Sequence, residues 1–533
     1  MPALEFVVLL GCALLAGGAL ARQLKVATPV MQLAAGVLLG FVPALRETEL
    51  PPEVLLLVFL PVLLYWESVT TSLRAIRRDL RGIVLTGTLL VAVTSWSVAV
   101  LGHLLGLPWG PAWVLGAAVA PTDATAVGVV SRLLPRRNVT LLRAESLIND
   151  GAALVIYSLA VGVTVGSEHL GVAHVSGLVA LSYGGGIAAG AAIAWLGIRL
   201  RRLVRRLGET MLDNLTIILI PFSAHLLAEQ VEASGVLAVV VCGLVMSQAG
   251  PSLGRAEARR QTMAFWSLAM YLLNGALFVL VGLEAQAAVR ELSGTALTDA
   301  LWMVAAISCA LVVVRFLFLS VAAYTIRALD RRPQQRERRM GHRARVVSAL
   351  AGFRGAVSLA LALSVPHTLD SGEPFPDRDT IVFVTAGVIV TTLVVQALVL
   401  PSVARWAQLP HDTDADRELA LARTAASEAA LDALPAVAAD LGTDPEVAER
   451  LRVEYETHLN TLRATETMDT PDADALVRHH EQDTVLRLAL LEHKRCAVTG
   501  LRDARRIDDA VLQRVQAQLD VEEVRLTPAA DLE

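Results

Sequence analysis

Apolar stretches long enough to span a bilayer recur along the first 408 residues, and short charged or Pro/Gly-rich breaks separate them. A helix that crosses the hydrocarbon core of a membrane needs about 20 mostly apolar residues. The chain is 54% hydrophobic and only 18% charged, which is not the composition of an ordinary soluble domain. The pattern therefore predicts an integral membrane protein made of helices.

Thirteen such segments predict an all-α transmembrane domain over residues 1–408, with boundaries set by the breaks. They lie near residues 3–21, 26–45, 51–68, 82–105, 111–133, 144–166, 174–199, 211–229, 234–249, 262–284, 297–327, 345–366 and 380–406. The fifth and twelfth segments contain polar or Gly-rich interruptions. In the first segment the basic residues follow the apolar run, which indicates a transmembrane helix rather than a cleaved signal.

Arginine accumulates in alternate breaks between the segments. RAIRRDLR and RLRRLVRRLGE are strongly basic, whereas the intervening GLPWGP and EQVEAS contain no arginine. Cytoplasmic loops of membrane proteins carry the excess of positive charge. Thirteen spans then place the N-terminus outside and the C-terminus in the cytoplasm of a cell-membrane protein.

From about residue 411 the sequence becomes polar and Ala-rich with helical spacing, so residues 411–533 are predicted to be a soluble, cytoplasmic helical tail. The tail could aid folding or dimer contact, or it could regulate by ligand or pH. The net charge of −5, with acids concentrated after residue 410, indicates no nucleic-acid partner. The four scattered cysteines suggest neither a disulfide framework nor a zinc site, and no cofactor is expected.

The sixth segment contains ESLIND, a polar cluster inside apolar sequence. An acid at the centre of a membrane helix costs roughly 2.5 to 3.5 kcal/mol, so its presence there suggests a function. Successive helix residues turn by about 100°, so Ser146 and Asp150 share one edge and Glu145 and Asn149 share another. The hydroxyl and carboxylate of the first edge are hard oxygen ligands suited to a small cation such as Na⁺.

The fifth segment contains APTDATAV, where a proline interrupts an apolar run. Pro121 removes a backbone donor and should move Ala120 away from helical angles. A broken helix is tolerated in a membrane only where the freed groups line a cavity or are buried in protein. Thr122 and Asp123 would then offer oxygen atoms to an ion, although a proline kink capped by these two residues is the alternative.

Glu67, in PVLLYWESVTTSL, is the only acid between Glu53 and Asp79. Two interpretations are open. The side chain could lie at the cytoplasmic interface, or it could accept a hydrogen bond from the amide of Asn149 and so fix the geometry of the ion site.

Two arginines are embedded in apolar sequence: Arg354, in the Gly-flanked FRGAVSLALAL of the twelfth segment, and Arg315, in ALVVVRFLFLS of the eleventh. An unpaired buried arginine is implausible because its desolvation is costly. Glu145 is the predicted partner of Arg354, since the acid needs neutralising as much as the base does. Arg315 is predicted to be a second structural base, paired with an acid that the sequence does not identify.

These motifs resemble the monovalent cation/proton antiporter family, which includes bacterial NhaP-type sodium/proton antiporters and the animal sodium/proton exchangers. The resemblance rests on APTDATAVGVVSRL, ESLINDGAALVIY and FRGAVSLALAL, which occur in that order. It covers residues 1–408. It implies thirteen helices in two inverted six-helix repeats whose broken fifth and twelfth helices cross near the midplane, and members usually form homodimers.

The resemblance also implies the roles of the polar residues. Glu145 and Arg354 would form a structural ion pair, and Asp150 would bind both the cation and the proton. The implied ion and proton site consists of Asp150, Asp123, Thr122, Ser146, Glu67 and Asn149.

The expected function is secondary sodium/proton antiport, not an enzymatic reaction. The Asn149-Asp150 pair resembles that of the electroneutral exchangers. A single acid that alternates between a proton and Na⁺ carries the same net charge in both states, so 1:1 exchange does not respond to membrane voltage.

Three alternatives stay open at the level of sequence. A potassium/proton antiporter, or one that also moves Li⁺, would use the same mechanism, because a few oxygen ligands do not fix the size of the site. A cation channel would need a continuous polar path. A membrane sensor would transmit its signal through the tail.

Overall fold

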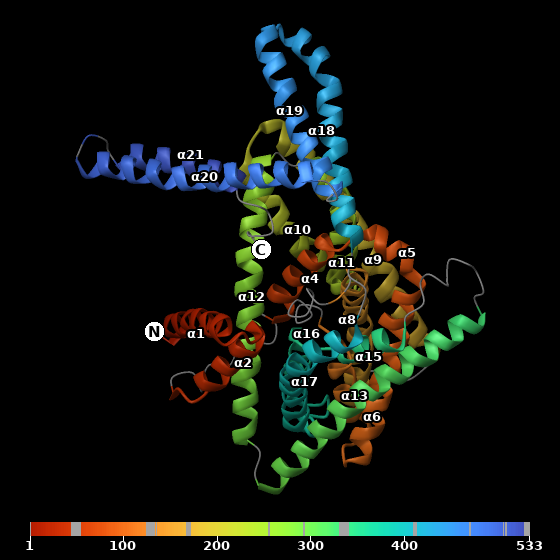
Figure 1. The fold of residues 1–533 in the computed structure, drawn as a ribbon. Coiled ribbons are helices and arrows are strands. Elements are labelled where there is room, and N and C mark those ends of the chain that lie inside the picture. Colours follow the sequence, from red (N-terminus) through yellow and green to blue (C-terminus); the bar gives the residue numbers. More distant parts are fainter. Residues whose placement is uncertain are drawn as a thin grey trace. The chain divides into compact units, whose positions relative to one another are not determined.

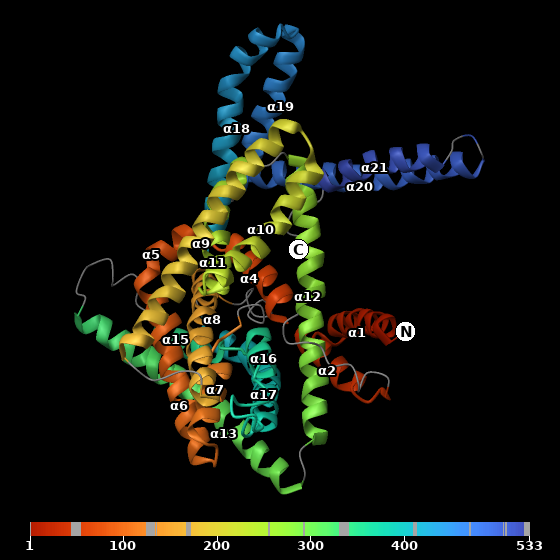
Figure 2. The same cartoon turned by 180° about the vertical axis from the view of Figure 1, so that it is seen from behind.

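The structure is a computed structural model of the 533-residue chain. It describes residues 2–43, 55–123, 134, 136–166, 172–253, 256–291, 294–329, 341–408, 413–467, 471–504, 506 and 509–526. Within these ranges the regular structure is helical, apart from one isolated bridge between Thr368 and Pro374. The chain divides into two compact units, Met1–His411 and Asp412–Glu533 (Figures 1 and 2).

The first unit contains all the apolar helices. They are α1 (Pro2–Leu24), α2 (Thr28–Leu39), η2 (Leu55–Phe59), α4 (Leu60–Thr70), α5 (Leu73–Val84), η3 (Leu85–Leu90), α6 (Val91–Leu104), α7 (Trp109–Val119), α8 (Arg136–Val165), α9 (Val172–Leu207), α10 (Thr210–Gln230), α11 (Gly235–Leu253), α12 (Ala256–Glu291), α13 (Gly294–Leu329), α15 (His342–Leu350), α16 (Ala356–Leu363) and α17 (Arg378–Ala407).

Each of the thirteen predicted segments falls on one of these helices or on a run of consecutive helices. The fourth segment is the continuous run α5, η3 and α6, and the twelfth is the broken pair α15 and α16. Among the described residues, eight helices are long and apolar enough to cross a membrane, and shorter apolar helices lie in α2, α4, α7 and α11. The predicted all-α membrane architecture is therefore confirmed. The part of the fifth segment after Asp123 lies outside the described residues.

Glycines allow the closest approach between helices. α2 packs along α12 (Figures 1 and 2). A Cβ atom at Gly36 would lie on the carbonyl of Val279, and one at Gly282 would lie on the carbonyl of Leu33. Small residues at such contacts let two backbones pack directly, which is a main source of helix association in lipid.

The two interrupted helices hold each other where their chains are unwound. α7 ends at Val119, and residues 351–355 separate α15 from α16. The backbone N–H of Asp123 donates to the carbonyl of Phe353 at 2.8 Å. The Nε of Arg354 donates to the carbonyl of Val119 at 3.0 Å. Polar backbone groups freed by one break are thus satisfied by the other, which is what a break inside a membrane requires.

The break after α7 begins at Pro121, one residue later than expected. Ala120 keeps helical angles, with φ of −69° and ψ of −42°, so the prediction that Pro121 displaces Ala120 from the helical region was wrong. A following proline disfavours helical angles without forbidding them. The missing N–H of Pro121 is sufficient to end the helix.

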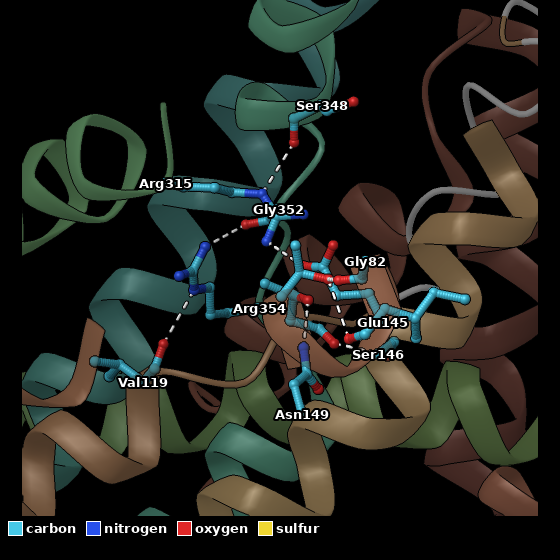
Figure 3. Close-up of polar contacts among 12 residues, drawn as sticks. Gly82, Val119, Glu145, Ser146, Asn149, Arg315, Ser348, Gly352 and Arg354 are labelled. Atoms are coloured by element: carbon cyan, nitrogen blue, oxygen red, sulfur yellow. Dashed lines mark hydrogen bonds and ion pairs between the residues drawn. The ribbon is translucent and has the colours of Figure 1, made fainter. Parts of the chain in front are cut away.

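The buried acid of α8 has a different direct partner from the predicted Arg354. Oε1 of Glu145 lies 2.5 Å from Nη1 of Arg315, on α13, and Nε of Arg315 also donates to the carbonyl of Ser348 at 3.0 Å (Figure 3). Arg354 instead donates to the carbonyls of Val119 and Gly352. Arg354 lies in the unwound segment, where carbonyl groups that are not bonded within a helix accept its hydrogen bonds. This explains why Arg354 binds backbone carbonyls and not Glu145.

Both arginines lie at the carboxyl ends of half-helices. Arg354 contacts the last residue of α7, and Arg315 contacts the last turn of α15. The unpaired carbonyls at a helix C-terminus carry a partial negative charge that favours a cation. The two guanidinium groups therefore stabilise the ends that the two breaks create.

The second unit consists of two helical hairpins: α18 (Thr413–Leu441) with α19 (Pro445–Thr467), and α20 (Pro471–Asp503) with α21 (Asp509–Leu526). Exposed ion pairs cross each hairpin, such as Lys494 with Glu522 at 2.9 Å. Exposed pairs of this kind add little stability. The few buried leucines between the helices supply the apolar contact: Leu459, Leu491, Leu512 and Leu519.

We expect Gly282→Ala to destabilise the membrane unit by about 1 to 3 kcal/mol, the usual cost of overpacking. The added methyl would meet backbone atoms of α2, which cannot rotate away. Gly11→Ala is the matched control, because a Cβ at Gly11 meets nothing within 4 Å. Melting temperatures in detergent, compared between the two variants, measure the effect, and equal values would refute the proposed backbone contact.

We also expect Glu145→Ala to cost about 3 to 5 kcal/mol, the range for breaking a buried ion pair by removing one partner. Arg315 would keep its charge and lose its carboxylate. The double variant Glu145→Ala, Arg315→Leu should recover most of this loss, because it also removes the guanidinium that has lost its carboxylate. Thermal unfolding of the parent and the two variants in detergent tests the pairing. A Glu145→Ala protein as stable as the parent would contradict it.

Candidate functional site

A cavity lies beside the break that follows α7. Five of the residues that line it were candidates from the sequence: Glu67, Thr122, Asp123, Ser146 and Asp150. Its described lining includes three carboxylates and no lysine, arginine or histidine. We call this space the acidic cavity.

Helix α8 presents Ser146 and Asp150 to the acidic cavity, one turn apart. Only 2% of Ser146 and 4% of Asp150 is exposed, and residues at i and i+4 share one side of a helix. The hydroxyl of Ser146 donates to the backbone carbonyl of Thr122 at 2.7 Å. This bond fixes the unwound segment against α8 beside the Asp150 carboxylate.

Thr122 receives a second bond from α8, which holds its side chain as well as its backbone. Nδ2 of Asn149 donates to Oγ1 of Thr122 at 2.6 Å (Figure 3). An accepting hydroxyl retains one lone pair and its own proton. The Thr122 side chain is therefore oriented by Asn149 and still has the capacity to contact a further group.

A second cavity adjoins Thr122, which lines both spaces. Glu145 and Asn149 line this second cavity together with Arg315 and Arg354. We call it the basic cavity. The two polar edges of α8 that follow from helical spacing thus face two separate cavities.

The structure does not join Glu67 to Asn149, a contact that one interpretation of the sequence required. The amide nitrogen of Asn149 donates to Thr122 instead, and Glu67 lines the acidic cavity while Asn149 lines the basic one. The Thr122 hydroxyl, in the break after α7, takes the place that Glu67 was expected to have. Glu67 is left to contribute its carboxylate to the acidic cavity.

Asp123 reaches the acidic cavity because glycine occupies position 355. A Cβ atom there would lie on the carboxylate of Asp123. Gly355 immediately precedes α16, and a helix N-terminus carries a partial positive charge that favours an acid. The glycines beside Arg354 therefore do more than position the arginine. Gly355 leaves space for the carboxylate of Asp123, which comes from the break after α7.

Two residues that the sequence did not single out also line the acidic cavity. They are Asn274, on α12, and Ser358, on α16. Ser358 follows the interruption of the twelfth segment by only a few positions, which is a signal that could have been used. Asn274 is the one polar side chain in YLLNGALF, and it could have been noted for the same reason as the acids.

The basic cavity touches an irregular part of the fourth span. Thr86 and Leu90 line it, and both belong to η3, a π-helical stretch between α5 and α6. π-helical turns inside α-helices often mark functional sites. Whether a helical stretch adopts π-helical hydrogen bonds depends on its packing, and nothing in the sequence LTGTLL predicts a π-helix there.

The arrangement separates two kinds of chemistry around one helix. The acidic cavity offers carboxylate, hydroxyl and backbone oxygen atoms, the hard ligands that alkali and alkaline-earth cations prefer. The basic cavity contains two guanidinium groups and one carboxylate. The first can attract and bind a cation, whereas the second stabilises the unwound segment that carries Thr122 and Asp123.

Comparisons with known proteins agree with this chemistry. The family described as sodium/hydrogen exchanger, transmembrane, matches residues 9–406. An uncharacterised Na⁺/H⁺ exchanger of Mycobacterium tuberculosis is 42% identical over 99% of this chain and 97% of its own length. A sodium, potassium, lithium and rubidium/H⁺ antiporter of Bacillus subtilis is 32% identical over 70% of this chain and 57% of its own.

The fold is shared with a solved antiporter. The sodium proton antiporter MjNhaP1 from Methanocaldococcus jannaschii superposes with a TM-score of 0.56 at 20% identity, over 76% of this chain and 99% of that one. The matched family spans the whole apolar part of the chain and includes both cavities. This multi-pass membrane protein belongs to the sodium/hydrogen exchanger family.

Proposed function

We propose that the protein exchanges one Na⁺ for one proton at the Asp150 carboxylate. The observation that carries the proposal is the composition of the acidic cavity: Asp150 is buried beside Glu67 and Asp123, and no base of the described chain lines the same space. Three carboxylates in a site of low dielectric attract a cation strongly. The family and the names of the relatives support Na⁺ and H⁺ as the substrates.

Competition for one carboxylate accounts for exchange. Asp150 either carries a proton or contributes an oxygen ligand to Na⁺, so the two substrates exclude each other. Thr122 and Ser146 supply further oxygen atoms at the same cavity. If the site moves between the two membrane faces only when it is loaded, as in transporters that rock around a midplane site, neither ion crosses alone.

Asn149, the residue before Asp150, supports an electroneutral exchange of one Na⁺ for one proton. Asn149 is an amide, so it has no charge to contribute, and it is occupied by its bond to Thr122. The loaded site then has the same charge with a proton as with Na⁺, and a membrane potential does no net work on the cycle.

Cation range, orientation and assembly belong to the same proposal. Na⁺ is the favoured cation, although the name of the Bacillus subtilis relative also includes potassium, lithium and rubidium. Positive charge in alternate loops supports an external N-terminus and a cytoplasmic position of residues 411–533. We expect a homodimer in the cell membrane.

Proteoliposomes test the exchange directly. In proteoliposomes with an imposed pH gradient, Na⁺ should dissipate the gradient with the parent protein and not with Asp150→Asn. The substitution replaces the carboxylate that is proposed to exchange the proton with an amide of nearly the same shape. Glu456→Gln, at an exposed pair in the second unit, is the control and should behave as the parent. Exchange retained by Asp150→Asn would overturn the assignment.

The same vesicles test stoichiometry and cation range. The membrane potential can be clamped at different values with valinomycin and impermeant counterions. The rate of Na⁺/H⁺ exchange should not change with the potential, because the site has the same net charge when it carries Na⁺ as when it carries a proton. A rate that rises or falls steeply with potential would contradict 1:1 exchange. Li⁺ and K⁺ titrations in the same assay give the cation preference.

Removal of residues 412–533 distinguishes a transporter from a sensor. The cut falls between the two compact units, and the acidic cavity lies wholly in the first. We expect Na⁺/H⁺ exchange to persist, with changes at most in stability or pH response. A truncated protein that reaches the membrane intact and has lost all exchange would favour a function residing in the tail.

A further inference from the structure

Ser358 has a buried hydroxyl group without a hydrogen-bond partner. Only 1% of the residue is exposed, and its Oγ has no partner among the described residues. A buried hydroxyl without a partner is costly, so each such case calls for an explanation. Ser358 is one of the residues that line the acidic cavity, so a transported ion or its water could supply the missing contact.

The break in the twelfth segment explains why this hydroxyl is free. Serine and threonine in helices usually donate to the carbonyl four residues earlier. Ser364, in the same segment, does so to Ala360 at 2.6 Å, and Ser68 does so to Leu64 at 2.6 Å. For Ser358 that carbonyl belongs to Arg354, which precedes the start of α16 and lies in the unwound segment.

Asn274 brings a second neutral oxygen to the same cavity from a different helix. It lies on α12, which packs against α16, and it is partly buried. No hydrogen bond is found for its side chain among the described residues, whereas Asn214 on α10 bonds to both Gln261 and Thr262. The amide of Asn274 is thus available to the contents of the acidic cavity.

We propose that Ser358 and Asn274 supply neutral oxygen ligands to the transported cation and thereby set which monovalent cation the site prefers. This inference rests on the proposed cation/proton exchange. The two residues come from α16 and α12, and the acids come from α4, α8 and the break after α7. A cation in the cavity would therefore meet oxygen atoms from elements on several sides.

Neutral ligands suit this task because they leave the proton competition unchanged. A hydroxyl or amide oxygen coordinates a cation without adding a charge that would itself titrate. Na⁺ and K⁺ differ in size and in the number of oxygen ligands they accept, so added neutral oxygens change their relative affinities. Ser358 and Asn274 are accordingly specificity-determining residues, and Asp150 remains the group that exchanges the proton.

The test measures the apparent KM for Na⁺, Li⁺ and K⁺, together with the maximal rate and its pH profile, in proteoliposomes. Ser358→Ala should raise the KM for Na⁺ about 3- to 10-fold, the usual effect of one lost polar contact. The ratio of KM for Na⁺ to KM for K⁺ should also change. The maximal rate and the pH profile should stay near those of the parent. Asn274→Ala should shift the ratio in the same assay.

Two controls separate this role from a structural one. Ser364→Ala removes a hydroxyl of the same segment that already has a backbone partner, and it should leave both KM and the cation ratio unchanged. Ser358→Thr retains a hydroxyl and should restore the parent preference. If Ser358→Ala does not fold, Na⁺-dependent thermal stabilisation of Ser358→Thr and Asn274→Ala in detergent gives the same comparison.

The outcomes distinguish this inference from the proposed function. A parent protein without cation-dependent proton movement refutes both. A parent that exchanges Na⁺ and H⁺, alongside Ser358→Ala and Asn274→Ala variants with the parent KM values and cation ratio, refutes only the role of these two residues. A selective change in KM and cation ratio in either variant supports that role.

Discussion

Hydrogen bonds between two unwound chain segments are the constraint on which the ion site depends. Asp123 N–H bonds to the Phe353 carbonyl, and Arg354 bonds to the Val119 carbonyl. Inside a membrane no water is available to satisfy these groups, so each break is stable only because the other lies against it. The same crossing brings Thr122 and Asp123 beside Asp150 and aligns Gly355 with the Asp123 carboxylate.

Acidic and basic side chains lie close to the two breaks, and helix α8 keeps them in separate cavities. One edge carries Asp150 and faces the carboxylates of Glu67 and Asp123 in the acidic cavity, and the other faces two arginines in the basic cavity. The Glu145–Arg315 pair neutralises part of the positive charge, while Arg354 is held by backbone carbonyls. No lysine, arginine or histidine is among the described residues that line the acidic cavity, so its carboxylates face a space into which a cation can enter.

Helical spacing in ESLIND was sufficient to predict two functional edges, because residues four apart must share a side whatever the tertiary packing. The sequence led to Arg354 as the predicted partner of Glu145, whereas the direct partner is Arg315. Both arginines lie in apolar segments, and the choice depends on how α13 and the second break approach α8. The hydrogen-bond partner of the Asn149 amide likewise could not be predicted from the sequence. The sequence identified a polar group in need of a partner, and only packing could select Thr122 over Glu67.

The sequence by itself determined the number and placement of the apolar helices, the two breaks and the acids of the site, because hydrophobic length, proline and helical period act locally. The tertiary structure alone decided which groups meet. It set the direct ion pair, the division of the polar residues between two cavities, and the placement of Ser358 and Asn274 beside the acidic one. These features depend on contacts between segments far apart in the chain, whose geometry no local pattern encodes.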